Sequence, residues 1–203
     1  MLKRLFLISS ILCLISTNVF SRSLTQSQVI EHASTLSQQW IMKDSRLLYV
    51  DTKAQKMYVL VNQKVQYVYS ISSSKYGVGN TSGSLKTPTG MHQIVEAYGD
   101  EAPLGTIFKA RINTGKRYSF KTSTPNDKKD HVLTRILRLK GLERGVNRGK
   151  GMDSYSRCIY LHGTNNESKI GTPTSRGCIR MRNLDIIDLY NYVKIGDYVY
   201  IRG

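Results

Sequence analysis

The residues best suited to covalent chemistry are Cys178 and His162, in the last quarter of the chain. Cys178 follows Gly177 within the run SRGCIRM at residues 175–181. A glycine lets the backbone approach a substrate closely, and flanking arginines favour a thiolate. A nucleophilic thiol also needs a base within hydrogen-bond reach, and His162 is the best candidate. We predict that the loop 163–177 folds back and brings Cys178 beside His162.

A disulfide between Cys158 and Cys178 is the competing interpretation, because cysteines of exported proteins are commonly paired. Residues 155–161 are predicted to form a strand on which Cys158 and His162 share one face. At about 3.3 Å per residue they are roughly 13 Å apart, whereas the sulfurs of a disulfide are about 2 Å apart. The dyad and the disulfide therefore exclude each other, and the spacing alone leaves both open. With the dyad, Cys158 is expected to be a buried packing residue.

The sequence predicts no metal or cofactor site. The glycine-containing stretches 76–80 and 87–90 lack the helix or the lysine of phosphate-binding loops, and they are interpreted as turns. The cysteines and histidines form neither a CxxC pair nor an HExxH motif. We therefore expect chemistry that uses side chains and backbone groups alone.

The elements that must position these residues are mostly strands, at 47–50, 57–61, 65–71, 91–97, 132–139, 155–161 and 198–201. One amphipathic helix is predicted over 26–41, with a capping box formed by Thr25 and Gln28. A second begins with Asn183 as its cap and Asp185 in its first turn. Its predicted apolar side consists of Leu184, Ile187, Leu189 and Val193. The expected class is mostly β with few helices (α+β), and mostly antiparallel.

The composition indicates a compact, basic protein. Of 203 residues, 40% are hydrophobic and 22% charged, and the net charge is +16. Six cations fall within residues 135–150, preceded by Lys128 and Lys129. They are interpreted as a solvated face, or alternatively as a surface that attracts anionic envelope polymers. Nucleic acid is not expected as a partner, because no nucleic-acid motif accompanies the charge.

The first 21 residues resemble a secretory signal peptide. Lys3 and Arg4 precede an apolar run at 5–15, and small or tolerated residues follow at 19–21. The run is too short to span a membrane comfortably. We expect export to the periplasm or cell envelope, with no stable membrane span after cleavage.

Two motifs at this spacing are characteristic of one family. YLHGTNN at 160–166 and SRGCIRM at 175–181 resemble the signature of YkuD-type L,D-transpeptidases, which act on the peptide stems of bacterial peptidoglycan. Residues 48–61 resemble the family's opening hairpin, 86–90 its TPxG turn and 196–201 its closing strand. The resemblance implies a YkuD-like β-sandwich or barrel catalytic domain at 45–203, preceded by a short helical extension at 22–44.

The resemblance also implies a role for each matching residue. Cys178 would be the nucleophile, and His162 would be the base, oriented through a backbone carbonyl. An oxyanion hole would be formed by the backbone N–H groups of Arg176, Gly177 and Cys178. Substrate contacts would be made by Gly163, Ser175 and Arg180, the last of them to a carboxylate. Many family members have histidine in place of Arg176, and asparagine in place of Arg180 is common. Proton transfer would therefore fall to His162.

The implied reaction has two halves. Cys178 attacks the carbonyl that joins the third residue of a tetrapeptide stem to D-alanine, and a thioester forms as D-alanine leaves. An amine on another stem, or on an envelope protein, then takes the acyl group. Transfer to water would instead make the enzyme an L,D-carboxypeptidase. A non-catalytic envelope-binding module and a disulfide-stapled structural protein are the alternatives from other classes.

Overall fold

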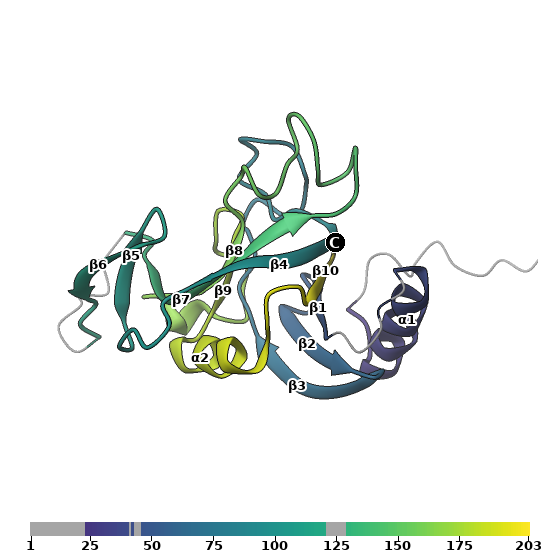
Figure 1. Ribbon diagram of the computed structural model, residues 1–203, viewed down its shortest axis with the longest axis horizontal. Coiled ribbons are helices and arrows are strands. Elements are labelled where there is room, and N and C mark those ends of the chain that lie inside the picture. The colour runs from purple at the N-terminus through teal and green to yellow at the C-terminus, as the bar shows by residue number, and fades with distance from the viewer. Residues whose placement is uncertain (1–22, 41, 43–45, 121–128) are drawn as a thin grey trace, which may run out of the picture.

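The computed structural model describes residues 23–40, 42, 46–120 and 129–203 (Figure 1). The predicted signal peptide lies outside these residues. Within them, no helix is long and apolar enough to cross a membrane.

Strands dominate the described part of the chain, as the composition of its segments predicts. Ten strands form one mixed sheet in the order β3-β2-β1-β10-β4-β7-β5-β6, and β8 joins β7 to β9. The strands are β1 Leu47–Asp51, β2 Lys56–Val61, β3 Lys64–Ser70, β4 Gly90–Tyr98, β5 Thr106–Lys109, β6 Ile112–Arg117, β7 Val132–Gly141, β8 Tyr160–Gly163, β9 Ile179–Met181 and β10 Tyr198–Arg202. The helices are α1 Gln26–Gln39 and α2 Asn183–Tyr192, with a 3-10 turn at Glu167–Lys169. Most pairs are antiparallel; β1–β10 and β8–β9 are parallel.

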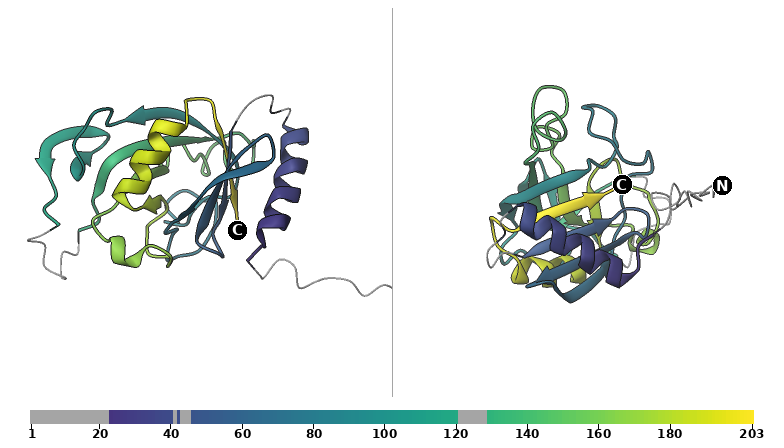
Figure 2. Two further views of the ribbon diagram at one scale, coloured as in Figure 1. Left: turned by 90° about the horizontal axis from the view of Figure 1, so that it is seen from below. Right: turned by 90° about the vertical axis from the view of Figure 1, so that its right-hand side faces the viewer.

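Strand β1 is buried on both faces, because α1 and α2 lie on opposite sides of it (Figure 2). Its residues alternate between two cores, as side chains of a strand must. Leu48 and Val50 pack in the core that includes α2, β8 and β9. Leu47 and Tyr49 pack in the core under α1. The core that α2 shares with β8 and β9 holds the predicted chemical residues in place.

Helix α1 confirms the predicted capping box. The Thr25 hydroxyl accepts a hydrogen bond from the Gln28 N–H, and the Gln28 side-chain oxygen accepts one from the Thr25 N–H. Val29, Ala33 and Leu36 are buried, at the helical spacing that the sequence indicates.

The second helix differs from the prediction in its cap and its buried face. Its N-cap residue is Arg182, which makes no side-chain capping bond, so the prediction of an Asn183 cap is wrong. Asp185 does lie in the first turn. Leu184, predicted to be on the apolar side, is 65% exposed, and Ile186 is buried instead. The Asn183 side chain turns inward because it bonds to the loop that follows β8.

The predicted strand at 155–161 is also wrong. The strand begins only at Tyr160, and residues 155–158 form a turn in which the Cys158 N–H donates to the Tyr155 carbonyl. Cys158 itself has a φ of 55°, in the left-handed region and outside the extended range of regular strand backbone. Strands β5, β6 and β9 were not predicted.

The basic segment is not one solvated face. Arg135 and Arg138 on β7 are each only 7% exposed. Arg135 donates to the Ala102 carbonyl, and Arg138 pairs with Glu96. Arg144, Arg148 and Lys150 are exposed, as predicted.

Candidate active site

The parallel pairing of β8 with β9 brings the two motifs together. His162 pairs with Arg180, and Cys178 lies two residues before Arg180 on the same side of the extended chain. With strands about 4.8 Å apart and about 3.3 Å per residue, the Cα atoms of His162 and Cys178 are roughly 8 Å apart on a diagonal. Side chains from one face can meet across that distance. The loop 163–177 does fold back and place β9 beside β8, whereas direct contact between Cys178 and His162 stays a prediction.

His162 is held as a neutral imidazole. It is 3% exposed, and its Nδ1 lies 2.7 Å from the carbonyl oxygen of Gly163. Because a carbonyl oxygen only accepts, Nδ1 carries the proton and Nε2 keeps a free lone pair. Burial lowers the pKa of the imidazole to about 4, against the opposing effect of the Gly163 carbonyl. No carboxylate is needed to orient this ring.

Cys178 rests as a thiol rather than as a thiolate. Burial of the sulfur raises the pKa of the thiol to about 11, although a backbone hydrogen bond from Tyr160 and the charge of Arg180 oppose the increase. The S–H donates to the carbonyl oxygen of Cys158, at 3.4 Å. The flanking arginines therefore do not produce the thiolate that the sequence suggested, because desolvation outweighs them.

Cys158 lies beside Cys178, not far from it. Its carbonyl contacts the Cys178 sulfur, and both side chains pack against the cluster around Phe108 and Tyr160. The separation of roughly 13 Å assumed an extended chain from 158 to 162, and the turn at Cys158 removes that assumption. Both thiols are free. The Cys158 sulfur lies 3.9 Å from the Arg111 guanidinium, which also donates to the Tyr160 hydroxyl.

The loop that carries Cys178 is fixed by its own hydrogen bonds. Gly177 has a φ of +125°, a conformation that other residues rarely adopt, and its N–H donates to the Ser175 hydroxyl at 3.2 Å. That hydroxyl donates in turn to the Cys178 carbonyl. Among the described residues, the N–H groups of Arg176 and Cys178 have no such acceptor. Of the three amides predicted for an oxyanion hole, only that of Gly177 has a protein acceptor among the described residues, and the role of all three stays a prediction.

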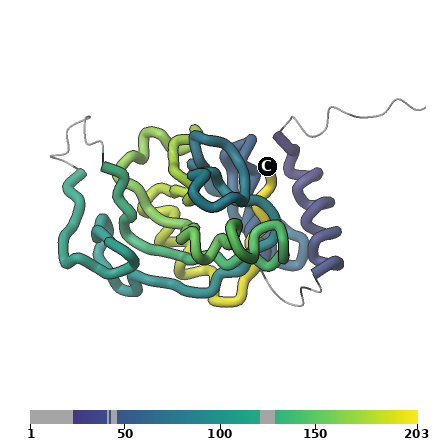
Figure 3. The backbone as a smooth tube through the Cα atoms, turned by 90° about the horizontal axis from the view of Figure 1, so that it is seen from above, coloured from purple at the N-terminus to yellow at the C-terminus, as the bar shows by residue number. Residues whose placement is uncertain are grey.

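A segment that is distant in sequence, around Thr87, forms hydrogen bonds with this loop. The Thr87 hydroxyl donates to the Gly177 carbonyl at 3.0 Å and accepts from the Ser74 N–H at 2.9 Å. Thr87 is fully buried. Segments 71–90 and 163–180 consequently run side by side (Figure 3), with bridges Ser72–Arg180 and Ser74–Ser175. The TPxG turn signalled the position of Thr87, but not its partner ninety residues away.

Asn183 and Gly163 complete the support of the histidine. The Asn183 amide donates to the Thr164 carbonyl and to Glu167, and its oxygen accepts from Thr134. A Cβ at Gly163 would collide with the Asn183 oxygen, so this glycine is required by packing. Its predicted substrate contact, like that of the buried Ser175, stays a prediction.

Comparison with known proteins agrees with this arrangement. Residues 45–201 match the YkuD family, described as the L,D-transpeptidase catalytic domain. The chain belongs to this family. The match covers β1 to β10 and includes the two motifs and the supporting TPxG turn.

Individual relatives carry the same description. YqjB of Bacillus subtilis strain 168, named as an L,D-transpeptidase, is 26% identical over 152 residues, which are 75% of this chain and 68% of YqjB. YkuD of Bacillus licheniformis is 54% identical over 41 residues, 20% of this chain and 25% of that protein. An L,D-transpeptidase structure from Mycobacterium smegmatis aligns at 17% identity with a TM-score of 0.47, and covers 78% of this chain and 59% of that one.

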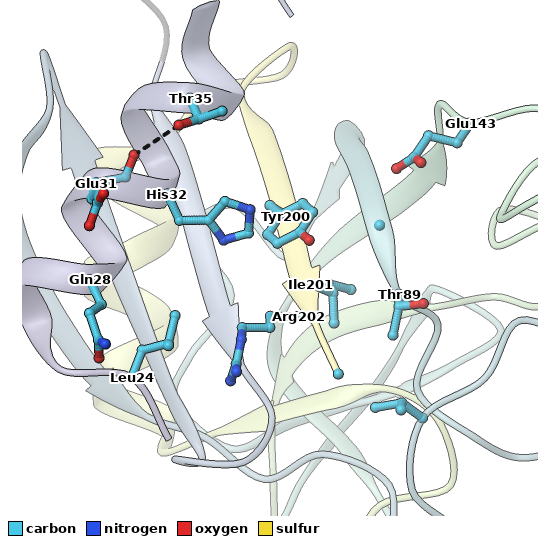
Figure 4. A pocket seen from close by; sticks show the side chains of 13 residues that line it. Leu24, Gln28, Glu31, His32, Thr35, Thr89, Glu143, Tyr200, Ile201 and Arg202 are labelled. Carbon is cyan, nitrogen blue, oxygen red and sulfur yellow. Dashed lines mark hydrogen bonds between the residues drawn. The ribbon is translucent and has the colours of Figure 1, made fainter. Parts of the chain in front are cut away.

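Two cavities of this L,D-transpeptidase domain lie side by side. A polar one of about 200 Å³ and one of about 390 Å³ that also has apolar lining share Lys129, Asp130 and Arg176. A larger cavity, about 830 Å³, lies between α1 and β10 and is lined by residues such as His32, Glu143 and Tyr200 (Figure 4). Neither Cys178 nor His162 lines any of these three cavities. No group of three His, Cys, Asp or Glu residues within the described ranges could hold a metal ion.

An ion pair near His162 and Cys178 joins one residue that was predicted from the sequence, Arg180, to one that was not, Asp130. Arg180 forms an ion pair with Asp130, just before β7, and lies 3.4 Å from the Thr174 hydroxyl. Both Asp130 and Arg180 act on the pKa of His162 and on that of Cys178. Asp130 carries no motif signal, because only the fold brings it to β9.

Proposed function

We propose that this protein is a peptidoglycan L,D-transpeptidase that uses Cys178 as its nucleophile and His162 as its base. The observation that carries the proposal is the pairing of β8 with β9, which sets the thiol and an imidazole with a free Nε2 on one face. Membership of the family supplies the substrate class, the peptide stems of peptidoglycan. The catalytic domain is proposed to span 45–203, after a signal peptide at 1–21 and a helical extension at 22–44.

The chemistry follows from the neutral state of the pair. The Cys178 sulfur attacks the carbonyl between the third stem residue and D-alanine, while its proton passes to Nε2 of His162. The N–H groups of Arg176 and Cys178 receive the developing oxyanion. His162 then returns the proton to the D-alanine nitrogen, the C–N bond breaks, and a thioester remains on Cys178. Because the thiol and the imidazole both rest uncharged, proton transfer accompanies attack rather than preceding it.

The second half of the reaction uses an acceptor. An amine of a neighbouring stem, or of an envelope protein, attacks the thioester, and the acyl group leaves Cys178. Water in the same place would give an L,D-carboxypeptidase that trims tetrapeptides to tripeptides. The envelope is the compartment where these substrates occur, and it agrees with the signal-like residues 1–21. A non-catalytic binding module remains the alternative class, but it has no need of a buried base beside a thiol.

The test is incubation of the chain lacking residues 1–21 with purified tetrapeptide muropeptides, followed by mass spectrometry. We expect loss of D-alanine and a thioester adduct on the peptide that contains Cys178. Cys178→Ala should abolish both, and Cys158→Ala is the matched control that removes the neighbouring thiol. Cross-linked dimers would indicate transfer, and tripeptides would indicate hydrolysis. D-alanine release by the Cys178→Ala variant would refute the mechanism.

A further inference from the structure

A strongly cationic cavity lies next to the dyad. It has a volume of about 200 Å³, and no apolar residue lines it. Its lining residues are Lys75, Lys129, Asp130, Asn165, Asn166, Thr174, Arg176 and Arg180. Four cations against one carboxylate give a net charge of 4 − 1 = +3. Charges of one sign gathered in a concave site attract a ligand of the opposite sign.

Neither Cys178 nor His162 lines the cavity, but two arginines that do line it flank Cys178 in sequence. Arg176 and Arg180 stand two residues before and two residues after Cys178, and Arg180 pairs with His162 across β8 and β9. The charges of Asp130 and Arg180 reach both members of the dyad. A group bound in this cavity would therefore belong to the part of a substrate nearest its scissile bond.

Two of the cations that line the cavity, Lys75 and Arg176, form no ion pair with a described carboxylate. Arg180 is balanced by Asp130, and its Nε is buried without an acceptor. Arg176 is exposed and has no carboxylate partner among the described residues. Lys75 holds the loop only through its backbone, since its N–H donates to the Ser175 carbonyl. Its ammonium lies over the Tyr76 ring, 5.1 Å from the centroid. Two flexible cations thus remain to meet a ligand.

We infer that this cavity binds a carboxylate of the acyl donor, and that Lys75 and Arg176 determine specificity for a free acid over its amide. This rests on the proposed function for its substrate class. A stem peptide ends in a carboxylate whose carbon is three bonds from the scissile carbonyl carbon, within about 4 Å. A carboxylate on the third residue is the other source of the same chemistry. Arg176 stands where many family members have histidine, so this cation distinguishes the chain.

The experiment compares three synthetic tetrapeptides: the free acid, its C-terminal amide, and a peptide amidated on the third residue's side chain. We expect kcat/KM to fall at least about 10-fold for the amide that removes the recognised carboxylate, because hydrogen bonds to charged groups are strong. Lys75→Met and Arg176→Met should each lower kcat/KM for the free acid by a similar factor. For the amide that lacks the recognised carboxylate, each variant should have nearly the same kcat/KM as the unmodified enzyme. Lys64→Met, on the edge strand β3, is the control that removes one exposed charge away from the cavity.

Binding to the Cys178→Ala variant, measured by titration calorimetry, separates the inference from the proposed function. Tighter binding of the free acid, lost with Lys75→Met but kept with Lys64→Met, would support the inference even if the unmodified enzyme released no D-alanine. Equal binding and equal turnover of all three peptides would overturn it. So would a loss caused by Lys75→Met that is the same on every peptide, since that is a structural effect.

Discussion

The neutral resting state of the dyad predicts an unusual pH profile for alkylation of Cys178. Only the thiolate reacts with iodoacetamide, so the rate follows the thiolate fraction. With the pKa of the thiol raised to about 11 from an ordinary 9.0, that fraction at pH 7 is about 10⁻⁴ rather than about 10⁻². We expect Cys178 to react roughly 100-fold more slowly at pH 7 than an ordinary exposed thiol. The rate should rise about tenfold per pH unit up to pH 10, without a plateau.

Peptide mapping by mass spectrometry distinguishes Cys178 from Cys158 in the same sample, and the Cys178 peptide is the one to follow. His162→Gln is the informative variant. If the resting pair is neutral, this change should alter the alkylation rate at pH 9 by only a few-fold. A plateau between pH 6 and 8 that disappears in His162→Gln would show a thiolate–imidazolium pair. That result would refute our account of how burial sets both pKa values.

Three further predictions concern stability and the neighbouring residues. Burial lowers the pKa of His162 and of His92 to about 4, so the unfolded state binds more protons than the folded state between about pH 6.5 and 4. As the pH falls through that range, the free energy of unfolding should decrease by an amount on the order of 3 kcal/mol per histidine, as measured by urea unfolding at a series of pH values. His92→Gln should remove part of this pH dependence. Thr87→Val leaves the Ser74 N–H and the Gly177 carbonyl unpaired, so it should lower the free energy of unfolding by about 2–4 kcal/mol. Thr114→Val, which removes a hydroxyl hydrogen bond on the exposed strand β6, is the control and should lower it less. Cys158→Ala should keep turnover within a few-fold, because the contact with Cys178 uses only the Cys158 carbonyl. It should lower the free energy of unfolding by about 1 kcal/mol, as measured by a thermal melt. A variant that is folded but inactive would contradict this prediction.

The sequence was a good guide wherever local pattern and tertiary contact agree. The strands near residues 47–71, 91–97, 132–139 and 198–201 alternate or run apolar between turn residues, and each is present. The glycine before Cys178 and the glycine after His162 mark two tight approaches of the backbone, and the sequence signals both. Both glycines turn out to be required, one by its φ and the other by the close packing of Asn183.

The turn at 155–158 could not be predicted from local pattern, because distant residues hold it. The Tyr155 hydroxyl donates to Glu96 on β4, and its ring lies under the Arg138 guanidinium at 3.5 Å. Arg138 also donates to the Tyr155 carbonyl. These contacts join three segments and stabilise a left-handed Cys158 that its own sequence does not favour. Alternation in the run from Tyr155 to His162 therefore predicted a longer strand than exists.

That turn has a consequence for the chemistry, because it decides where the thiol proton rests. A strand through Cys158 would aim its carbonyl along the sheet, whereas the turn brings that carbonyl to 3.4 Å from the Cys178 sulfur. The resting S–H thus donates to a carbonyl oxygen, which cannot act as a base. Nε2 of His162 meanwhile keeps a free lone pair. In the mechanism that we propose, the S–H must therefore leave the Cys158 carbonyl for Nε2 of His162 before attack. A thiol that stays protonated is also protected from oxidation, since the thiolate is the form that oxidants attack.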